Sequence, residues 1–236
     1  MSSARNGLIR ATAARYRSSG LTPFFFASNK IRYDPVFFAI LKSGLIQDHA
    51  RLLDLGCGQG LLLTLLSTAE SQYRRGFWAD DLPAPPTHLR MHGMELSAYE
   101  VATAQRASGD DAVISKRDLA NSDIPQADVM VMLDVLHYLD ENAQVDLIRR
   151  IAKSIPRDGV LLVREADSGG GNRFRVTKFA EQLAAINRGN WRQRFCFRSR
   201  DQWNALFQSN GFSVTDMPMS EGTPFANFLW VARRTS

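Results

Sequence analysis

Short apolar runs alternate with helical patterns from Arg51 onward, where apolar positions recur every three to four residues. The predicted strands are Arg51–Leu55, Arg90–Leu96, Ala112–Lys116, Asp128–Leu133, Val160–Arg164, Phe212–Met217 and Phe225–Ala232. The predicted helices begin at Leu61 and Ala98 and span Glu141–Ser154, Phe174–Asn187 and Arg200–Ser209. Strands that alternate with helices form βαβ units, so the pattern predicts an α/β protein with a parallel sheet.

The chain shows no internal repeat, no low-complexity tract and no linker rich in Gly, Pro or Ser. We therefore expect one globular unit with appendages. The connection between the first of these helices and the second strand, residues 78–90, contains three prolines and is long for an α/β unit. It is interpreted either as a functional insertion or as a disordered segment.

Composition fits a globular protein, because the 236 residues are 44% hydrophobic and 22% charged. No apolar run approaches the roughly 20 residues of a membrane-spanning helix, so a soluble protein is expected. The cysteines Cys57 and Cys196 form at most one pair, and their spacing suggests neither a disulfide framework nor a metal site. This cysteine usage favours the reducing cytoplasm.

Basic residues are concentrated at two places in the chain. Residues 1–33 carry six Lys or Arg and no acid, and residues 171–203 carry eight basic against two acidic residues. Such stretches are typical of surfaces that attract RNA, an anionic lipid face or an acidic carrier protein, but also of ordinary solvated helices. The Arg-rich start is also similar to an organellar transit peptide.

The segment Asp54–Gly60 carries the strongest chemical signal. It contains three glycines in the spacing G-x-G-x-G, between an apolar strand and the helix that begins at Leu61. Glycines at the carboxyl end of a parallel strand allow a tight turn and a close approach to a nucleotide-like ligand. The spacing is neither that of dinucleotide-binding loops nor that of phosphate-binding loops. The acid Asp54 suits a cationic ligand better than a pyrophosphate.

On these residues the chain resembles the class I S-adenosylmethionine-dependent methyltransferases, and the resemblance covers residues 51 to about 165. It implies a Rossmann-like fold with a seven-stranded, mostly parallel sheet, residues 1–50 as an N-terminal helical cap and residues 51–236 as the methyltransferase domain. It also implies S-adenosylmethionine as cofactor and S-adenosylhomocysteine as product. The cofactor-binding residues that it implies are Asp54, Gly56, Cys57, Gly58, Gly60, Glu95, Leu96, Asp118, Leu119, Asp134 and Val135.

Within this resemblance, the acid that binds the ribose is assigned to Glu95, which ends the second predicted strand. The interval from Gly56 is longer than the usual 20 or so residues, and the Pro-rich connection accounts for the excess. Asp80 and Asp81 are better spaced, but no convincing strand precedes them. Asp118 matches the acid that usually meets the adenine.

Candidate catalytic residues follow the fourth and fifth strands. His137 has an intrinsic pKa suited to a general base, although a His at this position of the fold often only packs under the following helix. Tyr138 faces either that helix or the substrate. Arg164 and Glu165 end the fifth strand on the same edge of the sheet and are candidates for orienting the substrate.

The substrate is interpreted from two segments. Residues 133–136 lack the Asn/Asp-Pro-Pro-aromatic pattern of enzymes that methylate base amines, which disfavours nucleic acid. The aromatic stretch 16–38, followed by the glycine motif, resembles bacterial methyltransferases of aryl polyene pigment biosynthesis. This likeness implies a phenolic substrate, small or bound to an acyl carrier protein. The alternatives are an RNA methyltransferase and a non-catalytic S-adenosylmethionine-binding accessory protein.

Overall fold

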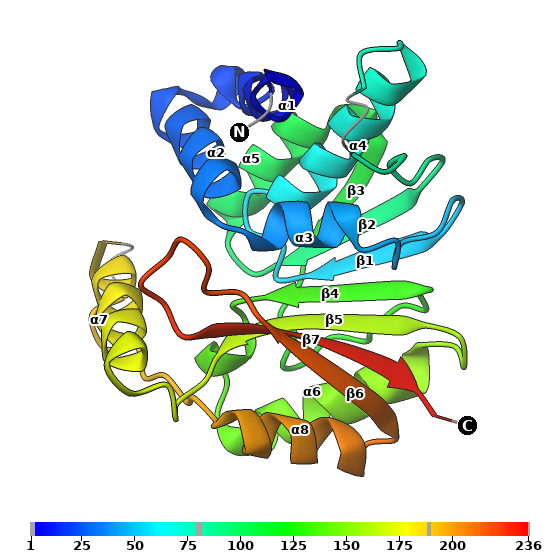
Figure 1. Ribbon diagram of the computed structural model, residues 1–236. Coiled ribbons are helices and arrows are strands. Elements are labelled where there is room, and N and C mark those ends of the chain that lie inside the picture. Colours follow the sequence, from blue (N-terminus) through cyan, green and yellow to red (C-terminus); the bar gives the residue numbers. More distant parts are fainter. Residues whose placement is uncertain (1–2, 79–81, 188–189, 236) are drawn as a thin grey trace.

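The computed structural model describes residues 3–78, 82–187 and 190–235. Its strands are β1 (Arg51–Leu55), β2 (Arg90–Glu95), β3 (Ala112–Lys116), β4 (Val129–Leu133), β5 (Val160–Ala166), β6 (Phe212–Pro218) and β7 (Asn227–Arg234). Its α-helices are α1 (Ser3–Ala14), α2 (Leu21–Tyr33), α3 (Val36–Lys42), α4 (Leu61–Arg74), α5 (Ala98–Ser108), α6 (Glu141–Ser154), α7 (Gly171–Asn187) and α8 (Arg200–Ser209). Figure 1 shows their arrangement.

The strands form one seven-stranded sheet in the order β3-β2-β1-β4-β5-β7-β6, in which β7 alone runs in the direction opposite to the other six. This is the predicted Rossmann-like methyltransferase fold. The order reverses between β1 and β4, and ligands of open α/β sheets bind beside the carboxyl ends at such a reversal. Because β7 is antiparallel to β5, it ends beside the amino ends of the parallel strands, where Arg233 pairs with Val160 at the start of β5.

Two apolar layers cover the sheet. Helices α1 to α5 bury one face, and α6 and α8 bury the other. In β1 the side chain of Leu52 belongs to the first layer and those of Leu53 and Leu55 to the second. This alternation follows from the two-residue period of a strand, and it places Asp54 on the same face as Leu52.

Local signals explain where several helices begin. The side chain of Asp140 accepts a hydrogen bond from Ala143 N and caps α6, and Ser199 forms a reciprocal capping box with Gln202 at the start of α8. The glycine turn leads directly into α4, since Gly60 adopts a left-handed conformation (φ 72°).

The N-terminal residues form three helices that pack on the sheet's first layer. Tyr16 is fully buried, and its hydroxyl donates to the carbonyl oxygen of Gln59 in the glycine turn at 2.9 Å. Arg15 donates to the carbonyl oxygens of Ala107 and Ser108 at the end of α5. These bonds connect the end of α1 to the domain that follows, and the action of residues 1–50 as a cap over a cofactor stays a prediction.

Candidate active site

The glycine turn after β1 is held by the neighbouring strand. Gly56 N and Cys57 N both donate to the carbonyl oxygen of Met94 on β2, at 2.8 and 3.1 Å. Gly56 has φ 76°, and a Cβ atom there would lie 2.5 Å from a methyl carbon of Val135, which follows β4. A side chain at position 56 would therefore clash, so the turn brings the ends of β1 and β4 into direct contact.

Glu95 connects the end of β2 to the same turn. Its carboxylate accepts from Gly58 N at 3.0 Å and from Ser97 N at 2.8 Å. A carboxylate has about four acceptor positions, so two remain for a ligand. Leu96, the next residue, is exposed.

Asp54 lies beneath the turn and is only 3% exposed. Among the described residues, burial and the charge of Glu95 are the influences on its carboxylate, and no hydrogen bond contributes. Burial, and next the negative charge of Glu95, raise the pKa of Asp54 to about 7. A buried carboxylate without a partner is costly, and the two acids together make this a place where a cationic group would be stabilised.

Asp118 and Leu119 follow β3. The Asp118 carboxylate accepts from Ala120 N and from the side-chain amide of Asn121, at 3.0 and 2.8 Å, so it shapes the turn after the strand. Leu119 is buried in the layer under α6. The structure places both at the carboxyl edge, where the sequence expects them.

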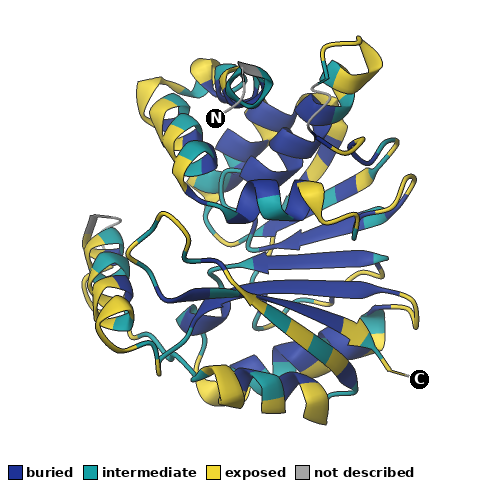
Figure 2. Ribbon diagram, in the orientation of Figure 1, coloured by how far each residue is buried: buried dark blue, intermediate teal, exposed yellow. Residues whose placement is uncertain are grey.

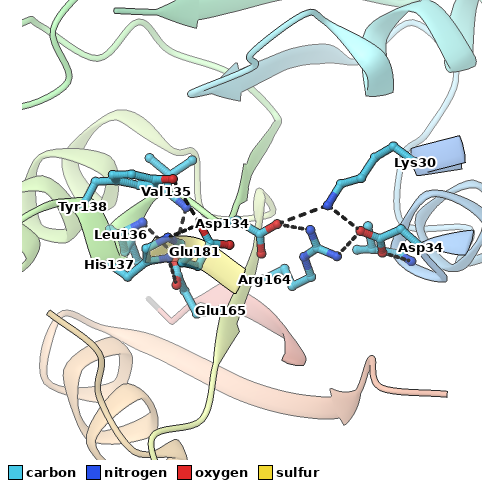
Figure 3. A network of polar contacts seen from close by, with 11 residues as sticks. Lys30, Asp34, Asp134, Val135, Leu136, His137, Tyr138, Arg164, Glu165 and Glu181 are labelled. Carbon is cyan, nitrogen blue, oxygen red and sulfur yellow. Dashed lines mark hydrogen bonds and ion pairs between the residues drawn. The ribbon is translucent and has the colours of Figure 1, made fainter. Parts of the chain in front are cut away.

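Arg164 is the centre of an ion-pair network that the sequence did not predict. Its guanidinium is 1% exposed and contacts Asp34 at the end of α2, at 2.5 Å, and Asp134 after β4. Lys30 on α2 pairs with Asp34 at 2.9 Å and lies 3.7 Å from Asp134. Burial by itself would raise the pKa of Asp34, but the cations Arg164 and Lys30 lower it to about 2. Figure 3 shows that these four charges connect α2 to the edge of the sheet.

A second network surrounds His137. Its Nδ1 lies 2.7 Å from a carboxylate oxygen of the fully buried Glu165, whose other oxygen accepts from Val135 N and Leu136 N. On the other side, the Tyr138 hydroxyl donates to Glu181 of α7 at 3.1 Å. The network therefore ties the segment after β4 to β5 and to α7.

The protonation state of His137 follows from its neighbours. Burial would lower its pKa, but the charges of Glu165 and Glu181 raise it to about 10. An imidazole with this pKa carries its proton at neutral pH and donates rather than accepts. These contacts favour the interpretation in which His137 packs and positions the segment after β4, and its part in catalysis stays a prediction.

The sequence matches a known protein family over most of its length. The family described as a methyltransferase domain matches residues 31–216. The chain belongs to this methyltransferase family. No curated protein matches the chain significantly.

Solved structures support the same fold. An O-methyltransferase family protein from Burkholderia thailandensis is 14% identical, with 97% of this chain and 64% of that chain covered and a TM-score of 0.65. The mitomycin 7-O-methyltransferase MmcR is 21% identical, with 94% and 59% covered and a TM-score of 0.62. DhpI, solved as a complex with SAH, is 16% identical, with 97% and 98% covered and a TM-score of 0.58. The chain thus spans about three fifths of the first two proteins, and the likeness concerns the fold.

Some partners in the site of this methyltransferase escape sequence reasoning. Lys30 and Asp34 lie in the aromatic N-terminal stretch, where no pattern marks Asp34 as a partner of Arg164 or Lys30 as a partner of Asp34 and Asp134. Glu181 carries a weak signal, since it is the only acid within α7. Asp80 and Asp81, the alternative ribose acids, lie outside the described residues.

The contact between Gly56 and Val135 gives a first prediction. Gly56→Ala adds both a left-handed backbone penalty of about 1–2 kcal/mol and a clash with a stiff β-branched side chain, on the order of 1–3 kcal/mol. Gly76→Ala is the matched control, because Gly76 has φ 75° and open space around it. Urea unfolding should show a larger loss for Gly56→Ala, and equal losses would contradict the close approach.

Proposed function

We propose that this methyltransferase uses S-adenosylmethionine and methylates a small organic molecule, free or bound to a carrier protein. A single observation carries the proposal. Beneath a glycine turn at the carboxyl edge, Asp54 is buried without a partner beside Glu95. A ligand with a positive charge and ribose hydroxyls satisfies both acids, whereas a pyrophosphate would be repelled by them.

The residues present fit such a cofactor. In the proposal, Glu95 binds the ribose hydroxyls with its two remaining acceptor positions and Asp54 faces the positively charged end. The adenine lies against Asp118 and Leu119. The rest of the binding surface comprises Gly56, Cys57, Gly58, Gly60, Leu96, Asp134 and Val135. When bound, the cofactor supplies an activated methyl group on a sulfonium, so the protein's task is alignment and exclusion of water.

We propose a phenolic hydroxyl as the acceptor, of the kind found in aryl polyene precursors. Aromatic side chains beside the site support a planar substrate, since Phe195 and Phe197 have ring centroids 5.6 and 5.0 Å from that of His137. Tyr138 is proposed to orient the substrate directly. Arg164 is proposed to do so through Asp34 and Asp134, whose carboxylates it holds, while His137 holds Tyr138 and Glu181 in place. The O-methyltransferase names of two structural neighbours agree with an oxygen acceptor.

The raised pKa of Asp54 predicts how binding depends on pH. When the pH is below the Asp54 pKa of about 7, a cationic cofactor must displace a proton from this carboxyl. The affinity for the cofactor should therefore fall as the pH falls, by up to about tenfold per pH unit. Asp54→Asn should remove this dependence and weaken binding about tenfold at pH near 8, because a hydrogen-bonding amide replaces the charge. Calorimetric titration with S-adenosylmethionine between about pH 6 and pH 8 measures both.

The control is Asp110→Asn, which changes an exposed acid beyond the end of α5 and should bind as the wild type does. If the wild type produces no binding heat at any of these pH values, the proposed function is wrong. If Asp54→Asn retains the pH dependence, another group is responsible and the role of Asp54 is wrong.

A further inference from the structure

The outer face of α7 exposes a row of large apolar side chains. Val176, Phe179, Leu183 and Ile186 are all exposed, and their spacing places them along one side of the helix. Figure 2 shows that α7 carries many exposed residues and lies at the side of the molecule. Single exposed apolar residues are common on protein surfaces, but a contiguous row on one helix marks an interaction surface.

The opposite face of α7 is the one that holds the helix on the protein. The Thr177 hydroxyl accepts from Ala226 N at 3.1 Å, and Glu181 accepts from Tyr138. The only acid of the helix therefore points inward to the site. The outward side carries no negative charge.

Basic side chains lie at the boundaries of this apolar row. At 100° per residue, Arg173 lies on one side of the row, and Arg175 and Lys178 lie on the other. A shallow hollow beside Phe179 is lined by Arg175 and Lys178. Basic residues often border the apolar face of a helix that lies on a membrane. Their aliphatic stems pack along the apolar surface, and their charges reach anionic head groups.

An exposed aromatic residue lies close to the end of α7. Trp191 is exposed and has the guanidinium of Arg192 4.4 Å from its ring centre, and the neighbouring Asn190 N donates to the carbonyl oxygen of Ala185 at 2.9 Å. The inner face of α7 borders the proposed site, because Glu181 contacts Tyr138 (Figure 3). The helix that carries the apolar row is thus next to the proposed substrate site.

We propose that the outer face of α7 binds an anionic lipid surface and brings the site to the membrane interface. The charge pattern of the helix favours lipid as the partner. Arg173, Arg175 and Lys178 border the apolar row on both sides and no acid lies on it, which is the pattern of helices that bind anionic lipid surfaces. In the part of the chain that the structure describes, no helix has the length and apolarity to cross a bilayer, so the contact would be peripheral.

Sedimentation of the full chain with vesicles tests the proposal without cofactor or substrate. We expect binding to vesicles of phosphatidylcholine and phosphatidylglycerol in equal parts, and little to phosphatidylcholine alone. Phe179→Ser should weaken binding about tenfold, because it removes one inserted aromatic side chain. The double variant Arg175→Glu and Lys178→Glu should weaken it about thirtyfold or more, at about 1 kcal/mol for each basic residue lost.

Matched controls lie elsewhere on the surface. Phe77 is 68% exposed against 64% for Phe179, and an arginine, Arg75, lies over its ring. Phe77→Ser and the exposed charge reversal Lys153→Glu should bind vesicles as the wild type does. The proposal is overturned if anionic vesicles are not bound, if Phe77→Ser weakens binding as much as Phe179→Ser, or if polyglutamate is bound and vesicles are not.

Discussion

Arg164→Met is expected to lower the free energy of unfolding by about 3–5 kcal/mol, the usual cost of removing one partner from a buried ion pair. The guanidinium is buried against Asp34 and Asp134. Without it, Lys30 is the one cation of the network left for both carboxylates, at 2.9 Å from Asp34 and 3.7 Å from Asp134. Methionine fills most of the volume of the arginine side chain, so the lower free energy of unfolding reflects the missing charge rather than a cavity. Urea denaturation followed by far-UV circular dichroism gives the value.

The control for this variant is Arg149→Met. Arg149 is more than half exposed and pairs with Asp146 at 3.4 Å, so its loss should cost less than about 1 kcal/mol. Asp34→Asn should recover part of the loss in the Arg164→Met background, because it removes one unpaired charge. A loss at position 164 no larger than at position 149 would show that the network does not stabilise the fold.

Glu95→Ala is expected to weaken S-adenosylmethionine binding by more than about 100-fold, since two hydrogen bonds to a charged acceptor contribute about 1.5–3 kcal/mol each. The variant also frees Gly58 N and Ser97 N, which the carboxylate now holds. Glu95→Gln keeps the shape and an acceptor oxygen, and should weaken binding about tenfold. If Glu95 contacts the ribose, both variants should lose affinity for S-adenosylhomocysteine, which lacks the sulfonium charge, by the same factors as for S-adenosylmethionine. Calorimetry measures these factors.

An exposed acid again provides the comparison, because Asp110→Ala should leave binding unchanged. If Glu95→Ala binds as tightly as the wild type, the ribose assignment is wrong, although the methyltransferase fold is unaffected. The Pro-rich connection would then become the segment to search for the ribose acid.

Most of the fold could be predicted because its elements carry their own signals. The bounds of each predicted strand lie within two residues of those of an observed strand. The helix predicted over Phe174–Asn187 is α7, which begins three residues earlier, at Gly171. Buried parallel strands appear as apolar runs, and the turns that end them contain glycine or a capping side chain. The three N-terminal helices had no predicted boundaries, since their apolar residues are spread over aromatic sequence without clear caps.

The site was predictable only where local sequence determines it. The glycine turn and the acids after each strand follow from strand ends that meet at one edge. The partners of Arg164 do not, because Asp34 lies 130 positions away in sequence. The state of His137 depends on Glu165 and Glu181, whose closeness arises only from tertiary packing. The carrier-bound aryl substrate stays a prediction.

The reversed direction of β7 has a practical consequence. This strand leaves Arg234 and Thr235 at the edge of the sheet remote from the glycine turn, α2 and α7. A tether attached there, on a sensor chip or an affinity resin, would point the protein's ligand-accepting edge toward the solution. Dissociation constants recorded for immobilised protein should then equal those in solution.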